Sequence, residues 1–438
     1  MAQRFRLWLR FLHIAWSSAW AVVGYLVARA LGGRRTAAEV ERLRGESVAH
    51  LLQKLGATFI KFGQILSTRP DLLGPGFIEP LARLQDSVKA ASFAAVERVL
   101  SEDLGERRAL LAEIEPTPVA AASVAQVHRA KLAGGDVIAL KVQRAEARVQ
   151  IERDLSILGF WAKLLDRFEA IRMLSLPGAV THFGEALRGQ LDFREEARNN
   201  ERFAKNFADV PNVDVPKLFP ELCTERVLAM EFVEGVKATE PEKVGGDRSK
   251  LARLGGEAVL KMIFTDGFVH ADLHPGNIIL TPDDRVVLVD LGLVSEIPQD
   301  LLRPWVETFV ALSQQNGAEC ARLFYVYAPT ISGTDYAAFE ADVVGYLKGL
   351  YDKKLGEVEV SHAVSGMMNI LRRHRVQIDP SFTVVNIALL VSEGLGKQLD
   401  PSIDLVPLAM PYLSQAMLSA PPGRAPLREP PKAAAPAN

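Results

Sequence analysis

The chain contains the run His270-Ala271-Asp272-Leu273-His274-Pro275-Gly276-Asn277, which is followed after a short turn by Val286-Val287-Leu288-Val289-Asp290-Leu291-Gly292. The first run places an asparagine five residues after an aspartate, and the second places an Asp-x-Gly directly after a short apolar stretch. Carboxylate and amide oxygens are ligands that Mg²⁺ accepts, and phosphoryl transfer also needs a carboxylate beside the attacking hydroxyl. We therefore predict that Asn277 and Asp290 hold Mg²⁺ and that Asp272 is the catalytic base.

A structural explanation of the same residues is that Asp, Asn and Gly form turns readily without any ligand. Either run alone would fit that explanation. Both runs occur together, however, in the chain order and with the connecting hairpin that the catalytic and metal-binding loops of protein kinases have. The functional interpretation is therefore favoured over the structural one.

The run Val137-Ile138-Ala139-Leu140-Lys141 ends in a lysine late in a predicted strand, upstream of these loops, as the strand lysine of kinases does. Such a catalytic lysine binds the α- and β-phosphates of ATP and pairs with a glutamate on a packed helix. We predict Glu196 as the partner, ahead of Glu195, because neighbouring helical residues point about 100° apart and only one can face the lysine. The alternative is that both glutamates lie on a solvated helix face.

The segment before the lysine departs from the kinase pattern. A kinase has G-x-G-x-x-G-x-V there, and this chain has alanine in each glycine position, at Ala120, Ala122 and Ala125, followed by Val127. Glycine adopts φ > 0 at little cost, whereas alanine does not. We therefore expect the phosphates to be held differently here. The alternative is a well-packed strand of small residues.

Together these motifs resemble the UbiB (AarF) family of atypical kinases. The segment Lys61-Phe62-Gly63-Gln64, followed by Ser67-Thr68-Arg69-Pro70-Asp71 and Leu84-Gln85-Asp86, is similar to that family's K-x-G-Q signature helix. The resemblance runs from about Leu43 to Val294. It implies an α+β, two-lobed, protein kinase-like fold with an enlarged helical C-terminal lobe. It also implies a helical N-terminal extension across the place where a protein kinase binds its peptide substrate.

The resemblance further implies roles for individual residues. Lys61 and Gln64 would reach from the regulatory extension into the nucleotide site, with Asp192 in the same contact. Lys141 and Glu196 would form an ion pair. The residues that would contact ATP are Ala120, Ala121, Ala122, Ser123, Val127, Ala139, Lys141, Glu196, Glu231 and Val233. The last two lie in the segment that would link the lobes and meet the adenine.

Several features depart from the family pattern. The family's E-x-D motif reads Gln190-Leu191-Asp192 here, so an amide replaces the carboxylate expected to meet Lys61, which weakens a charge pair to an ordinary hydrogen bond. The family's pair of C-terminal apolar helices is not evident, because Ile403 to Leu418 is short and holds one aspartate and two prolines. Ala271 replaces the arginine that would read an activation-loop phosphate, which argues against that form of regulation.

The first 35 residues form a basic and apolar leader. Its apolar run, Ile14 to Ala28, is flanked by arginines and is about 15 residues long, short of the roughly 20 that a spanning helix needs. Three interpretations remain open: contact with a membrane, a helix packed on the body of the protein, and a cleaved secretory signal.

The whole chain has 438 residues, a formal net charge of -2 and 24% charged residues. This composition excludes a disordered or collagen-like chain and argues against a nucleic-acid partner. Cys223 and Cys320 lack metal-binding spacing, which indicates a reducing compartment. Helical periodicity predicts continuous helices over 37–66 and 179–207. The predicted organisation is a leader at 1–35, a helical extension at 36–112, an N-lobe at 113–235, a helical C-lobe at 236–419 and a disordered Pro/Ala-rich tail at 420–438.

These features predict Mg²⁺-dependent ATP binding with slow hydrolysis or phosphoryl transfer to a small or lipid-soluble acceptor, at the cytoplasmic face of a membrane or in the cytoplasm. The resemblance implies a role in isoprenoid-quinone (ubiquinone-type) biosynthesis or membrane lipid homeostasis. It also implies a lipid or quinone-precursor acceptor, an anionic membrane surface and a lipid-biosynthetic protein complex as partners. Two alternatives remain: a Ser/Thr protein kinase, which requires the Lys61 helix to move away, and a non-catalytic scaffold that senses nucleotide.

Overall fold

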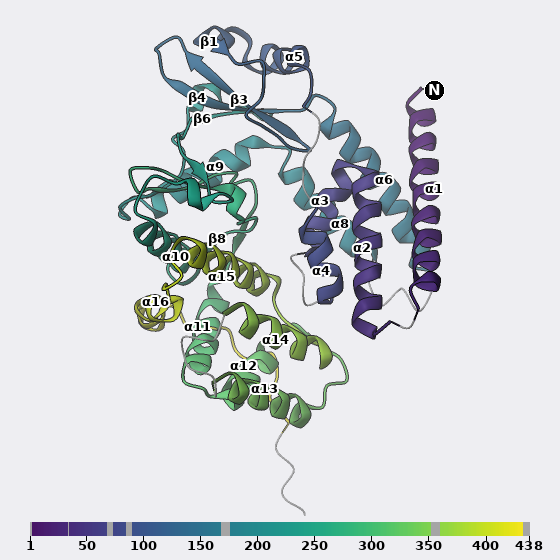
Figure 1. The fold of residues 1–438 in the computed structure, drawn as a ribbon, viewed down its shortest axis with the longest axis vertical. Coiled ribbons are helices and arrows are strands. Elements are labelled where there is room, and N and C mark those ends of the chain that lie inside the picture. Colours follow the sequence, from purple (N-terminus) through teal and green to yellow (C-terminus); the bar gives the residue numbers. More distant parts are fainter. Residues whose placement is uncertain are drawn as a thin grey trace, which may run out of the picture. The chain divides into compact units, whose positions relative to one another are not determined.

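The structure, a computed structural model, describes residues 2–33, 35–67, 73–84, 90–167, 176–351 and 360–431. The chain forms two compact units (Figure 1). The first unit contains Met1–Thr68, Leu73–Arg202 and Pro216–Val233, and the second contains Phe203–Val215 and Glu234–Asn438. The predicted α+β class is confirmed, because the first unit combines an antiparallel sheet with helices and the second is largely helical.

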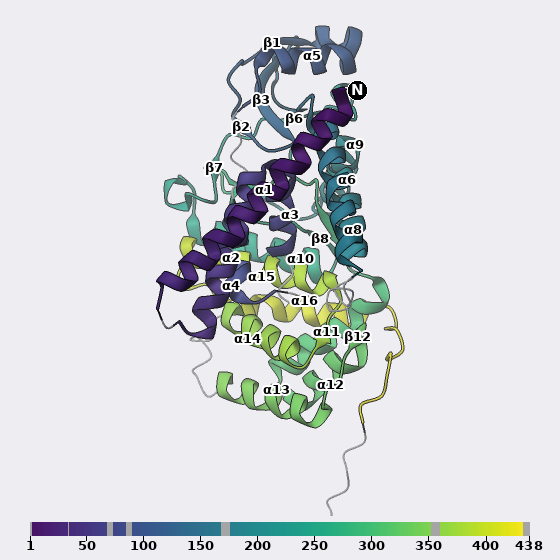
Figure 2. The ribbon, with the colours of Figure 1, turned by 90° about the vertical axis from the view of Figure 1, so that its right-hand side faces the viewer.

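Four helices open the first unit: α1 (Ala2–Leu31), α2 (Ala37–Leu55), α3 (Ala57–Ser67) and α4 (Pro75–Ala82). α1 lies alongside α2 (Figure 2). α2 begins at a capping box in which Thr36 and Glu39 each accept a hydrogen bond from the other's backbone N–H. The continuous helix predicted over 37–66 is wrong, because Gly56 ends α2 with a φ of 94°, a conformation that glycine adopts without strain.

The centre of the first unit is a five-stranded antiparallel sheet. β3 lies between β1 and β4, β4 also pairs with β6, and the short β2 pairs with the start of β3. The strand that the sequence predicts over 137–143 is present. The strands are β1 (Leu111–Ile114), β2 (Ala120–Ala121), β3 (Ala125–Leu132), β4 (Val137–Gln143) and β6 (Val227–Glu231).

Helices cover both faces of this sheet. On one face α5 contributes Leu100 to a cluster with Ile138 and Leu140 of β4. On the other face Ala139 of β4 packs in a cluster with Phe193 of α9. Successive strand residues point to opposite faces, so one strand serves both clusters. The remaining helices of this part of the chain are α5 (Phe93–Leu104), α6 (Ala147–Leu165), α8 (Leu176–Gly189), α9 (Phe193–Asn206) and the short η1 (Gly105–Leu110) and η2 (Pro220–Leu222).

The second unit contains small sheets that hold the predicted catalytic loops. One sheet has the strand order β5-β10-β9-β7, and two further pairs are β8 with β11 and β12 with β13. The predicted hairpin between the two motif runs is present as β9 and β10. The strands are β5 (Val213–Asp214), β7 (Val236–Lys237), β8 (Phe268–His270), β9 (Ile278–Leu280), β10 (Val286–Leu288), β11 (Val294–Glu296), β12 (Thr330–Ile331) and β13 (Val376–Gln377).

Helices form the rest of the second unit and share one apolar core. Trp305 of α11 and Phe382 of α15 meet edge to face in this core, with ring centroids 5.0 Å apart. The helices are η3 (Pro241–Lys243), α10 (Arg248–Phe264), η4 (Pro275–Asn277), α11 (Gln299–Ser313), α12 (Gly317–Tyr327), α13 (Tyr336–Tyr351), α14 (Val360–Arg373), α15 (Pro380–Leu399) and α16 (Leu405–Ser419).

The C-terminal segment differs from the disordered tail that the sequence predicts. Over residues 420–431 the chain packs against α11 and α12. Arg424 N donates to Asp300 O at 2.8 Å, and the guanidinium of Arg428 donates to Tyr325 O at 3.2 Å and to Ala328 O at 2.6 Å. Composition alone missed these contacts because they are made by backbone groups and two arginines rather than by apolar burial. Residues 432–438 lie outside the described residues.

Candidate functional site

Lys141 lies near the end of β4, opposite Val127 of β3 and Leu228 of β6. The alternation of the strand puts it on the same face as Ala139. Ala139, Val127 and Met230 belong to one apolar cluster on that face. Lys141 therefore lies beside an apolar cluster on the face of the sheet that α9 covers.

Lys141 forms the ion pair that the sequence predicts. Its Nζ lies 2.8 Å from Oε1 and 2.7 Å from Oε2 of Glu196, and the two side chains are only 12% and 6% exposed. The Phe193 ring lies 5.3 Å from the same Nζ, a distance at which a ring attracts a cation. Glu195 instead pairs with Arg198 at the surface. The role of the Lys141–Glu196 pair in binding nucleotide stays a prediction.

The start of α9 orients Glu196. The continuous helix predicted over 179–207 is wrong, because α8 ends at Gly189 and α9 begins at Phe193. Asp192 lies at this break, and its Oδ1 accepts hydrogen bonds from the N–H of Arg194 at 3.0 Å and from its Nε at 2.8 Å. The Arg194 guanidinium thereby holds the pKa of the Asp192 carboxyl below its usual value. The regulatory role predicted for Asp192 stays a prediction.

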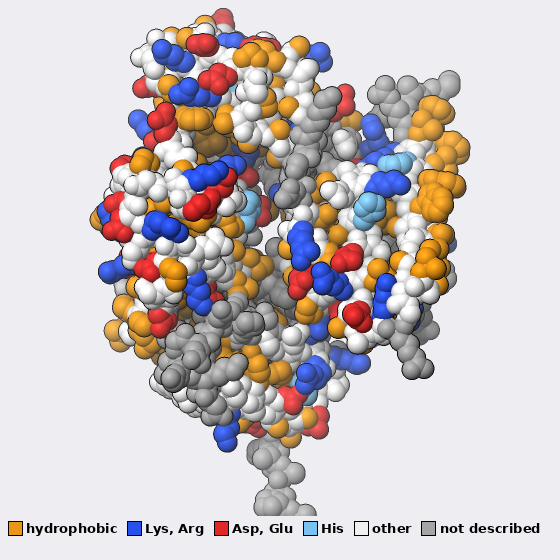
Figure 3. Space-filling model, viewed as in Figure 1, with side chains coloured by type: hydrophobic (Ala, Val, Ile, Leu, Met, Phe, Trp, Pro, Cys, Tyr) orange, Lys and Arg blue, Asp and Glu red, His pale blue; other side chains and the backbone are white. Residues whose placement is uncertain are grey.

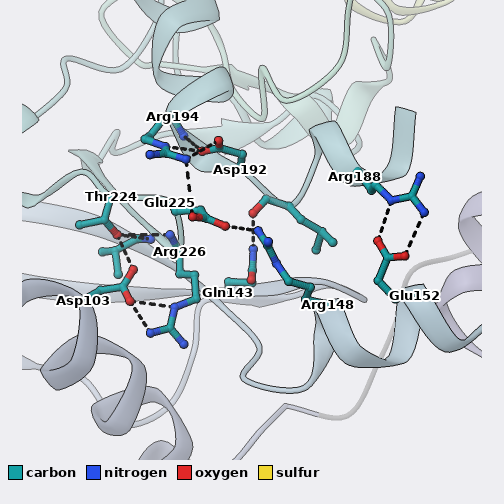
Figure 4. A network of polar contacts seen from close by, with 12 residues as sticks. Asp103, Gln143, Arg148, Glu152, Arg188, Asp192, Arg194, Thr224, Glu225 and Arg226 are labelled. Carbon is teal, nitrogen blue, oxygen red and sulfur yellow. Dashed lines mark hydrogen bonds and ion pairs between the residues drawn. The ribbon is translucent and has the colours of Figure 1, made fainter. Parts of the chain in front are cut away.

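A polar network ties the break to the sheet (Figure 4). Gln143 of β4 donates from Nε2 to Leu191 O at 2.7 Å. Arg194 also reaches Glu225 at 3.5 Å, and Glu225 pairs with Arg148 of α6. The residues just before Glu196 are thus tied to β4 through Leu191 and to Glu225 through Arg194, which fixes the start of α9 from which Glu196 reaches Lys141.

The alanine segment forms a tight turn. Ala120 pairs with Val127, and Ala122 N donates to Ala125 O at 2.8 Å. Where the structure describes the backbone, no residue from Ala120 to Val127 has a positive φ. The turn therefore uses only conformations that alanine adopts readily. Ser123, within it, is 7% exposed.

The structure brings the K-x-G-Q helix to this alanine turn. Lys61 and Thr58 of α3 line a small pocket together with Ser123 of the turn and Gln150 of α6. α3 and the alanine turn therefore meet within the first unit. The contact of Lys61 with a nucleotide stays a prediction.

The rest of the K-x-G-Q motif secures α3. Gln64 donates from Nε2 to Leu84 O at 3.0 Å. A Cβ on Gly63 would overlap a methyl of Leu84 and lie 2.9 Å from a methyl of Leu52, so glycine permits this close packing. The motif residues Thr68, Arg69, Pro70, Asp71, Gln85 and Asp86 lie outside the described residues.

The predicted adenine segment follows β6. Glu231 is tied to Lys217 by two hydrogen bonds, because its N–H donates to Lys217 O at 2.8 Å and its Oε2 accepts from Lys217 N at 3.3 Å. The next residue, Phe232, packs its ring 5.1 Å from the Arg129 guanidinium. Val233 is the last residue of the first unit. Adenine binding by this segment stays a prediction.

In the second unit His270 organises the loop that carries Asp272. Its ring is 1% exposed; Nδ1 accepts a hydrogen bond from Asp272 N at 3.2 Å, and Nε2 lies 3.2 Å from Val289 O. An accepting Nδ1 requires the proton on Nε2, which donates to the carbonyl. Burial lowers the pKa of His270. The ring is therefore neutral and holds the loop against the strand before Asp290.

Asn277 closes the same loop. Its Nδ2 donates to Asp272 O at 3.1 Å, its backbone N donates to His274 O at 2.8 Å, and the residue is 6% exposed. With the amide nitrogen engaged by the loop, the amide oxygen is the group suited to a cation.

Asp290 follows β10 and is exposed. Its φ is 58°, in the left-handed region that aspartate tolerates better than most residues. Such backbone conformations gather at functional sites.

These donors fit Mg²⁺. A carboxylate and an amide oxygen are hard ligands, and Mg²⁺ in proteins takes few protein ligands and completes its shell with phosphate and water oxygens. Across the described residues there is no group of three or more His, Cys, Asp or Glu side chains that would hold a metal ion without a substrate.

Two other histidines have structural roles. His128 is fully buried, with Nδ1 2.7 Å from Glu115 O and Nε2 2.8 Å from Gln126 Nε2. His274 caps η4 by accepting a hydrogen bond from Gly276 N at 3.0 Å.

Burial raises the pKa of the Cys320 thiol to about 12, which makes it unreactive near neutral pH.

The comparisons with known proteins agree with this geometry. Residues 83–324 match the ABC1 atypical kinase-like domain, and residues 346–404 match the UbiB helical domain. This chain belongs to the ABC1/UbiB family of atypical kinase-like proteins. The resemblance that the motifs carry is therefore confirmed, and the UbiB helical domain covers the end of α13 and the whole of α14 and α15.

Several ABC1/UbiB proteins are similar over most of their length. A probable protein kinase UbiB of Aeromonas hydrophila is 34% identical over 385 residues, which span 85% of this chain and 70% of that protein. A probable protein kinase UbiB of Shewanella woodyi is 31% identical, over 86% of this chain and 70% of that protein. An uncharacterized Synechocystis protein, slr1919, is 31% identical, over 86% and 68%.

A solved structure has a similar fold. It is titled as the complex of Rv3197 with erythromycin from Mycobacterium tuberculosis, and it superposes with a TM-score of 0.54 at 23% sequence identity, covering 80% of this chain and 94% of that chain. At this identity the likeness shows the fold alone.

Sequence reasoning missed two residues at these sites. His270 was read only as part of its motif, although an imidazole two residues before the predicted base is a signal for a group that orients the loop. Met230 was not singled out, although it lies directly opposite Ala139 in the sheet and only 9% of it is exposed. The sequence signal for Met230 is its position, one residue before Glu231 of the predicted adenine segment.

Proposed function

We propose that this protein binds Mg²⁺-ATP and slowly transfers the γ-phosphoryl group to water or to a small, lipid-soluble acceptor. The observation that carries the proposal is the buried Lys141–Glu196 pair. Burying two charges is costly unless they form a close ion pair. Even then, two apolar residues of similar size would stabilise the fold as much or more. A lysine held in this way serves as a fixed cation for phosphate oxygens.

The second unit supplies the other chemical groups that the reaction needs. Mg²⁺ held by Asn277 and Asp290 would neutralise the charge that develops on the phosphate oxygens. Asp272 would accept the proton of the attacking hydroxyl at its carboxylate. His270, neutral and hydrogen-bonded to Asp272 N, positions that carboxylate without taking the proton.

We infer an acceptor connected with isoprenoid-quinone (ubiquinone-type) biosynthesis or membrane lipid homeostasis at the cytoplasmic face of a membrane. The inference rests on the UbiB name of the relatives and on the helix in the described residues that is long and apolar enough to cross a bilayer, Trp8–Leu31. A lipid-biosynthetic protein complex is the partner that such an acceptor implies.

The test is ATP binding and phosphate release by the full chain, with and without Mg²⁺, for three variants. Asp272→Asn is expected to keep nucleotide binding and to lower turnover at least about 100-fold, since it removes the base. Asp290→Asn is expected to lose the Mg²⁺-dependent part of binding. Asp283→Asn is the matched control, because Asp283 is an exposed aspartate in the hairpin between the two motifs.

The outcomes separate the alternatives. Nucleotide binding that is absent, or unchanged in Asp290→Asn, would contradict the proposal. Binding without any turnover, and cellular function that survives Asp272→Asn, would favour the nucleotide-sensing scaffold. Transfer of labelled phosphate to a protein hydroxyl would favour the Ser/Thr protein kinase.

A further inference from the structure

The outer face of α1 is an exposed apolar stripe. Trp8, Leu12, Trp16, Trp20, Val23 and Val27 follow one another at spacings of three or four residues, which puts them on one side of a helix. Trp16 is 66% and Trp20 is 55% exposed. Figure 3 shows hydrophobic side chains gathered along α1, at the right-hand edge of the view. Phe160 of α6 is also 54% exposed, and its ring centroid lies 5.8 Å from that of Phe11.

The opposite face of α1 is bound to the body of the first unit. Ile14 and Ser17 are buried there, and the ring of Phe11 stacks on Trp161 of α6 with a centroid distance of 5.3 Å. Arg10 donates from Nε to Asp154 Oδ1 at 2.8 Å and from Nη2 to Leu55 O at 2.6 Å. α1 is therefore an integral part of the unit rather than a separate arm.

The ion pair at this interface weighs against a spanning helix. The Asp154 side chain is 0% exposed and that of Arg10 is 18% exposed. If α1 left α2 and α6 to cross a membrane, this buried pair would be broken, which is strongly unfavourable. α2 cannot follow α1 into hydrocarbon, because it carries acidic and basic residues along its length.

The positions of the tryptophans point the same way. In a helix that spans a bilayer, tryptophan gathers at the two ends, at the level of the headgroups. Here Trp16 and Trp20 lie in the middle part of the apolar segment Trp8–Leu31, where a spanning helix would meet hydrocarbon. All the tryptophans of α1 share one stripe, as in a helix that lies parallel to the membrane surface.

We propose that α1 docks the first unit onto a lipid bilayer by lying in the plane of the interface, with the Trp8–Val27 stripe in the headgroup and upper acyl region and its other face still bound to α2 and α6. The partner is an anionic bilayer surface, because α1 contains no acidic residue and three arginines besides Arg10, which pairs with Asp154, and Arg29 at its end is exposed. The proposal stands on α1 and its neighbours and is independent of the nucleotide chemistry.

Flotation of the full chain with vesicles tests the stripe. We expect binding to phosphatidylcholine vesicles that contain a quarter phosphatidylglycerol, and weaker binding to phosphatidylcholine alone. Trp16→Glu is expected to lower the partition coefficient at least about tenfold, because it puts a charge into the interface. Val344→Glu of α13 changes an exposed valine of the second unit and is expected to leave the coefficient unchanged.

Labelling distinguishes the in-plane helix from a spanning one. His13 and Leu31 are exposed and lie 18 residues apart, which is five helical turns and about 27 Å along the axis, close to the thickness of a bilayer core. Each is replaced by cysteine in a chain whose Cys223 and Cys320 are alanine. Both positions are expected to react with a membrane-impermeant maleimide added outside sealed vesicles.

Protection of one position only would mean that α1 spans the bilayer, and would overturn the proposal. Absence of vesicle binding would also overturn it, as would a stripe-dependent dimer in solution that does not bind vesicles. ATP binding measured on Trp16→Glu is expected to match that of the unaltered chain, so that a failure of lipid docking is distinguishable from a failure of the proposed catalysis.

Discussion

At the scale of single residues, the Lys141–Glu196 ion pair predicts that one substitution changes both the stability of the first unit and its nucleotide binding. Removing the charge of Glu196 leaves the ammonium of Lys141 buried without its carboxylate, an arrangement that costs several kcal/mol. For Glu196→Gln we expect the free energy of unfolding of the first unit to fall by about 3 kcal/mol and Mg²⁺-ATP binding to be lost. Urea unfolding and nucleotide titration measure the two effects.

Glu195→Gln is the matched control for this prediction. Glu195 is the adjacent residue, and it is half exposed and paired with Arg198 at the surface, where an ion pair contributes less than about 1 kcal/mol. Equal effects of the two substitutions would contradict the assignment of Glu196 as the partner of Lys141.

His270 predicts a dependence of stability on pH. Burial holds the pKa of His270 in the fold below the ordinary histidine value of about 6.5, so below about that pH the unfolded chain binds a proton that the folded chain does not. The free energy of unfolding is then expected to fall as the pH decreases through about 6.5, by up to about 1.4 kcal/mol for each pH unit. Urea midpoints measured between about pH 7.5 and 5.5 give this slope.

His270→Gln is expected to flatten that slope, since glutamine does not titrate. His50→Gln is the control, because it removes an exposed histidine from another part of the chain. If both substitutions change the slope equally, His270 is not the group that stays neutral in the fold.

At the scale of elements, the crossing of α2 and α4 depends on two glycines. A Cβ added to Gly45 would overlap the carbonyl oxygen of Gly76 and lie 2.8 Å from Phe77 Cα. Backbone atoms cannot yield as a flexible side chain can, so the helices would have to separate. For Gly45→Ala we expect a loss of about 2 kcal/mol in the free energy of unfolding, measured with urea.

Gly159→Ala is the opposite case on α6. A Cβ there would have no heavy atom within 4 Å, so the higher helix propensity of alanine is expected to add up to about 1 kcal/mol of stability. No loss of stability in Gly45→Ala would contradict the close approach of α2 to α4, and a loss in Gly159→Ala would contradict the open space beside Gly159 of α6.

Elements also show where sequence reasoning succeeds. The alternation in Val137–Gln143 predicts a strand, and the strand is present because both faces of β4 find apolar partners, Leu140 on one and Ala139 on the other. Periodicity failed at residues 190–192, where the helical pattern continues through a break. There the hydrogen bonds from Arg194 to Asp192 and from Gln143 to Leu191 O outweigh local helix propensity.

At the scale of the whole molecule, the C-terminal segment packs against the end of α12, which lies about a hundred residues earlier in the chain. Arg428 donates to the carbonyls of Tyr325 and Ala328 at the end of that helix, where carbonyls lack helical partners. For Arg428→Met we expect the free energy of unfolding of the second unit to fall by about 1–2 kcal/mol. Thermal unfolding measures this loss of stability, and hydrogen exchange shows whether the loss is located in α12.

Glu429→Gln is the control, since Glu429 is the next residue and is exposed. If exchange in α12 is unaffected by Arg428→Met, then the segment 420–431 does not hold the helix end, and the disorder that its composition predicts would be the better description.

The sequence by itself determined the chemistry that the chain carries. Local sequence is enough to recognise the motif with Asp272, Asn277 and Asp290, the strand lysine Lys141 and the family. The reason is that short-range spacing fixes which groups share a loop or a strand face. The tertiary structure alone decided which contacts join distant segments. It brought Arg10 to Asp154 across 144 residues, gave His270 its tautomer, and left one face of α1 bound and the other bare. The physical reason is that burial and ion pairing depend on the neighbours that packing supplies, and local sequence does not specify them.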